Sequence, residues 1–311
     1  MDLDVTFLGT AASAPTAHRG LPALLVRRGG ERLLFDCGEG TQRQLMQAGA
    51  MGEIDDVFVT HMHTDHVMGL PGLLKTYDLH GRERRLRLWG PPGMLKFYDR
   101  LKGLVGHPKG FDVQVEELDA GEELPGDGSY AVHTFNVDHA GQAYGYALIE
   151  DDRPGRFDAK LAQSLGVDFG PDFGRLQAGE TVNGVTPDQV IGPARPGRSV
   201  VVTGDSAPCE MTRVMAEGAD LLVHEATFLE SDSDRARETH HSTAAGAARL
   251  AAEAEVTQLA LTHISSRYFV RDIVAEARAE FEATLVPRDF DQITVPFAES
   301  GKPELVRAGG D

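Results

Sequence analysis

The sequence contains few of the residues that mark secreted or membrane-spanning proteins. Among its 311 residues there are 2 cysteines and 1 tryptophan. Two cysteines, Cys37 and Cys209, are too few for a disulfide framework, which favours a reducing compartment. No apolar run approaches the ~20 residues that a membrane-spanning helix needs, and the acidic start Asp2-Leu3-Asp4 lacks the basic and apolar regions of a signal peptide. We therefore expect a soluble, cytoplasmic protein with no membrane partner.

Positive charge is also scarce. The chain has 48 Asp and Glu against 30 Lys and Arg, a formal net charge of −18. Proteins that bind nucleic acid are usually basic, so the overall charge argues against such a partner. Residues 71–110 are an exception, with nine Lys or Arg against three acids, a local net charge of +6. Such a patch can attract phosphate groups, although the run Arg82-Glu83-Arg84-Arg85 is equally explained as a solvated loop.

Apolar runs and turn residues alternate along most of the chain. Hydrophobic residues make up 41% of it, enough for a sizeable core. Short β-branched runs predict strands, and longer runs with helical spacing predict helices. We expect strands at 5–10, 21–27, 32–36, 57–60, 86–89, 111–117, 130–139, 145–149, 199–203, 221–224 and 258–262, and helices at 40–48, 70–80, 94–105, 242–254 and 271–281. This order is typical of an α/β protein with mixed sheets and outer helices.

One stretch, residues 153–198, departs from this pattern. It holds eight Gly and five Pro and shows little periodicity. A connection of this length inside a domain is usually either functional or disordered. We interpret it as an arm inserted into a single domain that spans residues 1–311. A disordered insertion without function is the alternative.

The strongest chemical signal is the segment His61-Met62-His63-Thr64-Asp65-His66, which follows an apolar strand. Four potential metal ligands within six residues are rare by chance, and imidazole nitrogen and carboxylate oxygen are ligands of divalent metals. In a loop at the strand end, His61 and His63 can point to one metal while Asp65 and His66 point to a neighbour. The segment therefore predicts a two-metal site, with a histidine-rich surface loop as the alternative.

Two metals need further ligands, and three single residues at strand ends are candidates. His139, Asp205 and His263 each follow an apolar strand, and in α/β folds the carboxyl ends of the strands gather the site. Asp205 is the expected bridge, because one carboxylate can offer an oxygen to each metal. Each of these residues alone is more often a capping or surface residue. Together with the histidine cluster they predict one centre.

This ordered set of residues resembles the metallo-β-lactamase superfamily. The pattern HxHxDH at 61–66, followed by His139, Asp205 and His263, carries that likeness. Narrower segments are similar to the ribonuclease Z family in particular, and the likeness covers almost the whole chain. These segments are Phe7-Leu8-Gly9-Thr10, residues 34–42, residues 69–74, His224-Glu225-Ala226-Thr227-Phe228, His241-Ser242-Thr243 and residues 261–268.

The resemblance implies a fold and a metal content. The fold is the metallo-β-lactamase fold, an αββα sandwich of two mixed sheets with outer helices and the inserted arm. The metals are two Zn²⁺ per subunit. The first is assigned to His61, His63, His139 and Asp205, and the second to Asp65, His66, Asp205 and His263. Manganese or iron can occupy the same ligands.

The resemblance also implies an activity, the endonucleolytic removal of the 3′ trailer from precursor tRNA. The products are a tRNA with a 3′-hydroxyl and a trailer with a 5′-phosphate. Asp65 is expected to orient or deprotonate the attacking water, and His241 to contact the scissile phosphate and protonate the leaving oxygen. Glu225 is expected to hold His241 in position, as a carboxylate behind a histidine often does.

The arm is similar to the flexible exosite of the short-form members, which grips tRNA away from the active site. Family members are homodimers in which the arm of one subunit serves the other. Substrate contacts are therefore expected from Arg153, Arg156, Lys160 and Arg175 in the arm and from Arg19, Ser242 and Thr243 elsewhere. The loop at residues 15–20 keeps Pro15 and Arg19 of a Pro-x-Lys-x-Arg-Asn loop found in many members but lacks its Lys and Asn. That departure leaves the cleavage position open.

Three alternatives stay open at this stage. A thioesterase, lactonase or β-lactamase has the same fold, which does not fix the substrate, but small substrates need neither the arm nor the segment at 241–243. A non-catalytic RNA-binding protein is opposed by the complete set of ligands. A general phosphodiesterase or exonuclease that acts on other RNAs is also compatible with the sequence.

Overall fold

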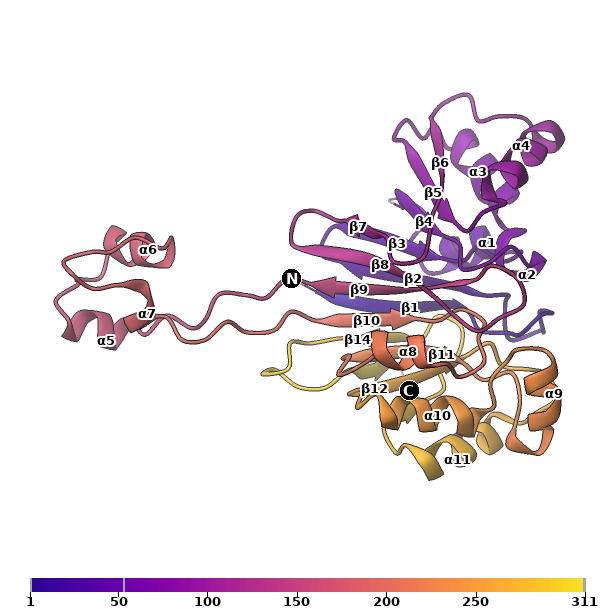
Figure 1. Ribbon diagram of the computed structural model, residues 1–311. Coiled ribbons are helices and arrows are strands. Elements are labelled where there is room, and N and C mark those ends of the chain that lie inside the picture. Colours follow the sequence, from indigo (N-terminus) through magenta and orange to yellow (C-terminus); the bar gives the residue numbers. More distant parts are fainter. Residues whose placement is uncertain (1, 53, 310–311) are drawn as a thin grey trace.

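Two β-sheets face each other across the centre of the molecule in the computed structural model, which describes residues 2–52 and 54–309 (Figure 1). The first sheet has eight strands in the order β15-β14-β1-β2-β3-β4-β5-β6. They are β1 (Leu3–Gly9), β2 (Ala23–Arg28), β3 (Glu31–Phe35), β4 (Asp56–Phe58), β5 (Leu86–Gly90), β6 (Val113–Glu117), β14 (Gln292–Thr294) and β15 (Glu304–Val306). Strands β1 to β3 pair antiparallel and β3 to β6 pair parallel, so the sheet is mixed.

The second sheet has seven strands in the order β13-β12-β11-β10-β9-β8-β7. They are β7 (Glu123–Pro125), β8 (Tyr130–Asn136), β9 (Tyr144–Glu150), β10 (Ser199–Val202), β11 (Leu221–Glu225), β12 (Gln258–Thr262) and β13 (Thr284–Leu285). Strands β10 to β13 run parallel, whereas β7 to β10 run antiparallel. This sheet is therefore mixed as well.

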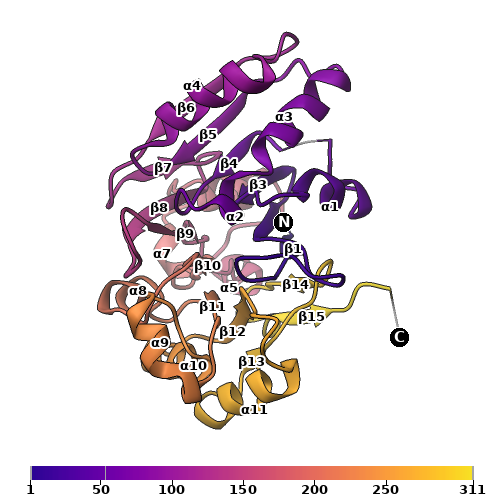
Figure 2. The same ribbon diagram turned by 90° about the vertical axis from the view of Figure 1, so that its right-hand side faces the viewer.

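Helices cover the outer face of each sheet (Figure 2). The first sheet carries α1 (Thr41–Gln47), α3 (Leu70–Leu79) and α4 (Met94–Val105), and the second carries α8 (Glu210–Met215), α9 (Ser233–Glu238), α10 (Ala244–Glu253) and α11 (Val270–Glu280). A short 3₁₀ turn, η1 (Glu230–Asp232), precedes α9. One apolar cluster lies between the sheets and one lies between each sheet and its helices. The layers follow the predicted αββα order.

The alternation of side chains along each strand explains the layers. In β3, Leu33 and Phe35 point between the sheets, while Leu34 points toward the helices. Phe35 stacks on Phe58 with ring centroids 5.1 Å apart. On the other side, the buried residues of α10 are five alanines, Gly246 and Leu250. Because most of these side chains are small, this helix packs closely on the second sheet.

The insertion between β9 and β10 forms an arm that projects from one end of the sandwich (Figure 1). Its two extended segments pair at Arg153 with Arg195 and at Phe157 with Ile191. Beyond them lie α5 (Ala159–Ser164), α6 (Pro171–Gln177) and α7 (Pro187–Val190). These helices pack around a separate apolar cluster that includes Val167, Phe173, Leu176 and Val190. The arm is thus a folded head on a two-stranded stalk.

Every strand and helix predicted from the sequence is present, but several short elements were missed. They are β7, β13, β14 and β15, the helices α8 and α9, and the three helices of the arm, where little periodicity was expected. The prediction that the histidine segment is entirely a loop was also wrong. Its second half forms α2 (Thr64–Val67), with His63 in extended conformation as the preceding residue. Within the described residues, no helix has both the length and the apolar character to cross a membrane.

Candidate metal centre and active site

The predicted ligands come together at one end of the sandwich, where several strands end. His61, His63, Asp65 and His66 follow β4, and His139, Asp205 and His263 follow β8, β10 and β12. Gly204 sits at a φ of +63°, and a Cβ there would lie 2.7 Å from the side chain of Thr60. The absence of a side chain at Gly204 therefore lets the loop that carries Asp205 approach the end of β4 closely.

The first cluster joins His61, His63, His139 and Asp205, whose ligand atoms all lie within 4.8 Å of one another. His61 Nε2 lies 3.0 Å from His63 Nδ1 and 3.7 Å from Asp205 Oδ2. His139 Nε2 lies 3.2 Å from His63 Nδ1. Around a tetrahedral zinc with ligands at about 2.0–2.1 Å, neighbouring ligand atoms are about 3.3 Å apart. The four side chains therefore have the spacing of a metal site.

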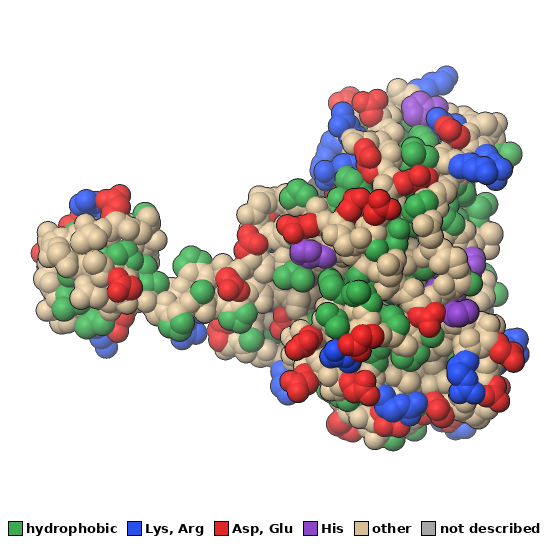
Figure 3. All heavy atoms as spheres, in the orientation of Figure 1, with side chains coloured by type: hydrophobic (Ala, Val, Ile, Leu, Met, Phe, Trp, Pro, Cys, Tyr) green, Lys and Arg blue, Asp and Glu red, His purple; other side chains and the backbone are tan. Residues whose placement is uncertain are grey.

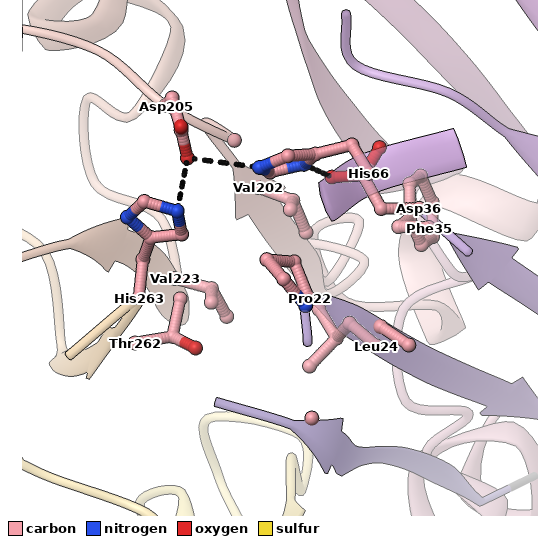
Figure 4. A pocket seen from close by; sticks show the side chains of 13 residues that line it. Pro22, Leu24, Phe35, Asp36, His66, Val202, Asp205, Val223, Thr262 and His263 are labelled. Atoms are coloured by element: carbon pink, nitrogen blue, oxygen red, sulfur yellow. Dashed lines mark hydrogen bonds and ion pairs between the residues drawn. The ribbon is translucent and has the colours of Figure 1, made fainter. Parts of the chain in front are cut away.

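The second cluster joins Asp65, His66, Asp205 and His263. The Oδ1 atom of Asp205 lies 3.3 Å from Nε2 of His66 and 3.3 Å from Nε2 of His263 (Figure 4). Oδ2 of Asp65 lies 3.7 and 3.5 Å from the same two nitrogens. Asp205 belongs to both clusters and uses a different oxygen in each, as expected for a bridging carboxylate.

Three buried atoms in the second cluster have no hydrogen-bond partner among the described residues: His66 Nε2, Asp205 Oδ1 and His263 Nε2. A buried polar atom without a partner costs about 1–3 kcal/mol, so an ion that these atoms ligate accounts for their arrangement. Figure 4 shows Asp205 pointing at both histidines, with Pro22, Leu24, Val202 and Val223 in the wall of the adjoining 30 Å³ cavity. The residues present fit two divalent metals with nitrogen and oxygen ligands.

The sequence did not single out the residues that orient these ligands. Asp36 accepts a hydrogen bond from Nδ1 of His66 over 2.7 Å. It also accepts one from Oγ1 of Thr60 over 2.9 Å, and this hydroxyl lies 3.0 Å from Nδ1 of His61. One carboxylate therefore positions one histidine in each cluster, the first directly and the second through a threonine. In the sequence, only its position at the end of a strand, within the segment at 34–42, marked Asp36 as a candidate.

A second carboxylate repeats this arrangement on the opposite sheet. Glu225, fully buried at the end of β11, accepts from Nδ1 of His241 over 2.6 Å. Its other oxygen accepts from Oγ1 of Thr227 over 2.6 Å, and that hydroxyl lies 2.8 Å from Nδ1 of His263. The ring of His241 stacks on that of His263 with centroids 5.6 Å apart. The predicted proton donor and a metal ligand thus share one support.

The site holds its histidines in different charge states. Burial lowers the pKa of His61 to about 2, with the neighbouring His66 adding to the effect, so its imidazole is neutral and able to ligate. Burial also opposes charge on His66, but the carboxylates of Asp205 and Asp36 outweigh it and raise its pKa. Metal binding would displace that proton. Burial likewise opposes charge on His241, yet its hydrogen bond to Glu225 raises the pKa to about 9. The hydrogen bond to Glu225 thus favours the protonated form of His241.

The backbone is strained at two positions of the site. Asp36 and His263 both have a positive φ, 59° and 55°. Residues with a Cβ adopt this conformation at a cost of roughly 1–3 kcal/mol and usually where the surroundings enforce it. Here the strain aims His263 at the second cluster and Asp36 at His66.

Three of the residues expected to contact substrate lie outside the arm. The Ser242 hydroxyl is buried and donates to the Ser206 carbonyl over 2.7 Å. Thr243 is buried, accepts from the Gly246 amide and caps α10. Both hydroxyls are thus engaged in the turn that carries His241, and their contact with substrate stays a prediction. Arg19 is half-buried and donates to the carbonyl of Pro287 over 3.1 Å, beside a cavity of about 370 Å³.

The arm cations divide into paired and unpaired residues. Arg175 bonds Asp172 and Glu180 within the head, and Arg153 bonds Glu299 in the body. Arg156 and Lys160 are exposed, and neither has an ion-pair partner in the part of the chain that the structure describes.

Acids outside the basic segment at 71–110 neutralise part of it. Arg82 pairs with Asp55 over 2.6 Å and Arg87 pairs with Asp56 over 2.6 Å. Acidic and basic side chains are interspersed over the visible face of the body (Figure 3). Part of the segment is therefore a locally paired surface, as the interpretation as a solvated loop expects.

Known proteins resemble this chain over nearly its full length. A ribonuclease Z of Haloferax volcanii is 46% identical over 308 residues, which cover 96% of this chain and 97% of that protein. The crystal structure of the short form of human tRNase Z matches with a TM-score of 0.70 and 29% identity, covering 94% of this chain and 99% of that one. The metallo-β-lactamase fold protein YhfI of Bacillus subtilis, at 18% identity, matches with a TM-score of 0.70 over 95% of this chain and 100% of its own. A family model described as anti-Pycsar protein Apyc1 matches residues 3–152. The predicted metallo-β-lactamase fold is thereby confirmed.

Proposed function

The chain belongs to the ribonuclease Z family, and on that premise we propose that it is a zinc-dependent endoribonuclease that removes the 3′ trailer from precursor tRNA in the cytoplasm. The observation that carries the proposal is the pair of ligand clusters joined by Asp205, with His241 held at their edge by Glu225. A thioesterase or lactonase of the same fold needs the ligands but has no use for a 46-residue arm at 153–198.

Two zinc ions per subunit suit the ligands. One would be held by His61, His63, His139 and Asp205, and the other by Asp65, His66, Asp205 and His263. When bound, zinc supplies water that ionises near neutral pH and neutralises charge on the phosphoryl oxygens. The nitrogen-rich ligand set and the spacing of about 3.3 Å between ligand atoms support this choice.

The chain's own residues would then direct the proton transfers. Asp65, a member of the second cluster, orients the attacking water or takes its proton as the new bond from water oxygen to phosphorus forms. The bond from phosphorus to the 3′ oxygen breaks, and His241 donates its proton to that oxygen. Glu225 keeps the imidazole protonated and correctly turned. The products are a tRNA with a 3′-hydroxyl and a trailer with a 5′-phosphate.

The arm leaves the body at the end opposite the metal centre. Strand β10 begins with Ser199 at the stalk and is followed by Asp205 at the metals. An arm that starts on the far side is poorly placed to hold substrate for its own centre. We therefore include a homodimer in the proposal, with the arm of each subunit serving the partner's site. Arg156 and Lys160, which have no ion-pair partner among the described residues, would bind RNA phosphates. Arg153, Arg175 and Arg19 would contact phosphates while they keep their present partners.

The test is an analysis of product ends. Zinc-loaded protein is incubated with a precursor tRNA that carries a 3′ trailer, and in parallel with a thioester and a lactone. The proposal predicts one cut near the acceptor end, a tRNA with a free 3′-hydroxyl and a trailer that accepts no further 5′-phosphate from a kinase. Turnover of the thioester or lactone without cleavage of the tRNA would leave the metal centre standing but overturn the proposed substrate.

A further inference from the structure

The root of the arm is tied to a segment near the C-terminal end of the chain. Arg153 and Arg195 face each other across the stalk, and their backbones exchange hydrogen bonds of 2.7 and 2.9 Å. Both guanidinium groups reach the same carboxylate. Arg153 contacts Glu299 with two nitrogens, each at 3.0 Å, and Arg195 contacts it at 3.0 Å. Glu299 thus connects the two segments of the stalk from outside.

An aromatic ring beside Glu299 strengthens the connection. The guanidinium carbon of Arg153 lies 3.4 Å from the centroid of Phe297, and that of Arg198 lies 4.2 Å from it. Arg198 is itself fixed in the body, because it is buried and bonds both oxygens of Glu150 at 2.8 Å. Phe297 therefore connects a cation of the body to a cation of the stalk by two cation–π contacts.

These contacts lie at the root of the stalk, so a small change of angle there displaces the head of the arm by a larger distance. A stalk segment of roughly eight residues (151–158) spans roughly 26 Å at ~3.3 Å per residue. A tilt of roughly 10° at its root displaces the head by roughly 4–5 Å, more than a hydrogen bond tolerates. A single exposed ion pair restrains little, but a carboxylate shared by two arginines and backed by an aromatic ring restrains the direction of the stalk much more.

We propose that Phe297 and Glu299 are positioning residues, which fix the direction of the arm and through it the place where precursor tRNA binds. The inference rests on the proposed function for its kinetic consequence, but the contact itself does not depend on it. In this account Arg153 and Arg195 serve the arm by anchoring it to the body. The metal centre lies at the other end of β10 and is independent of the anchor.

Kinetics of four variants test the role. Phe297→Leu keeps the bulk of the side chain but removes the ring face, and Phe297→Tyr retains it. Glu299→Gln removes the shared charge, and Glu304→Gln is the matched control, an exposed acid on the adjacent β15. We expect Phe297→Leu and Glu299→Gln to raise KM for precursor tRNA about tenfold or more with kcat little changed. Both should hydrolyse bis(p-nitrophenyl) phosphate at the wild-type rate, and the Tyr and Glu304 variants should match wild type throughout. An unchanged KM in both anchor variants would overturn the role.

Hydrogen exchange separates this inference from the proposed function. In the full-length protein, the amides of Arg153 and Arg195 bond across the stalk, and their exchange should accelerate about tenfold in Phe297→Leu and Glu299→Gln. The amides of the head, around Val167 and Leu176, should exchange as in wild type. If wild type does not cut precursor tRNA, the proposed function fails, yet faster exchange at the root would still support the anchor. Equal exchange at the root in all variants would refute the anchor whatever the substrate is.

Discussion

Nδ1 of His241 donates to the carboxylate of Glu225 over 2.6 Å, and the other oxygen of that carboxylate accepts from Thr227, which supports His263. One buried acid thus holds both the proposed proton donor and a metal ligand. The two rings that it supports stack on each other. In the proposed mechanism, a single side chain therefore links proton transfer to metal binding.

The charge of Glu225 should be needed for His241 to donate its proton. Glu225→Gln keeps the size of the side chain but removes the charge that holds the proton on His241. We expect the single-turnover rate on precursor tRNA to fall by roughly 10²-fold. Zinc content, measured by mass spectrometry on the same sample, separates lost proton transfer from lost metal. A rate within twofold of wild type with full zinc would contradict the role of Glu225.

A pair of substitutions at Thr227 tests the relay to His263. Thr227→Ser keeps the hydroxyl between Glu225 and His263, whereas Thr227→Val is nearly the same size and removes it. Since a group that orients a metal ligand typically contributes 10- to 100-fold in affinity, the Val variant should bind zinc roughly 10- to 100-fold more weakly. The Ser variant should resemble wild type. Competition with a chromophoric chelator measures both, and equal affinities would exclude the relay.

Asp36, which follows a strand of the other sheet, should have the equivalent effect on zinc affinity. Asp36→Asn weakens the hydrogen bond that fixes the ring of His66. It also removes the negative charge that orients His61 through the hydroxyl of Thr60. We predict zinc affinity lower by roughly 10- to 100-fold. Added zinc should restore most of the activity, because Asp36 touches no substrate in this account. Activity that stays lost at saturating zinc would show that the residue does more than orient ligands.

The two cysteines should differ in reactivity and neither should affect the metals. Burial raises the pKa of Cys37 to about 12, so at about pH 8 only roughly one thiol in ten thousand is ionised. Cys209 is half-buried at the start of α8. Ellman's reagent should therefore modify Cys209 alone in the folded protein and both thiols after unfolding. Loss of zinc on this labelling would show that a thiol takes part in the metal site.

The sequence predicted the two ligand clusters because each of their residues is marked by its place at the end of an apolar strand. The side chains that hydrogen-bond to these ligands were harder to predict from the sequence. Asp36 and His66 lie 30 positions apart, and Thr227 reaches His263 only because β11 and β12 pair in parallel. Such contacts depend on the register between strands, which periodicity along one strand does not define. The burial of Ser242 and Thr243 and their hydrogen bonds could not be read from the motif at 241–243 either.

The short and paired elements were missed for related reasons. Strands of two or three residues, such as β13 and β14, are too short to show alternation. The helices of the arm have four to seven residues, and they are stable because they pack on one another. The basic segment at 71–110 looked like an uncompensated patch because Asp55 and Asp56, which neutralise part of it, precede it in sequence.

Cleavage of a labelled precursor tRNA by wild type and by His241→Ala, both with zinc, is the most direct test of the proposed function. Zinc content should be the same in the two proteins, because His241 belongs to neither of the two predicted ligand sets. The account predicts a single cut near the acceptor end by wild type and a rate reduced by roughly 10²–10⁴-fold in the variant. Equal cleavage by both proteins would contradict the role of His241, and no cleavage by zinc-loaded wild type would contradict the assignment to tRNA.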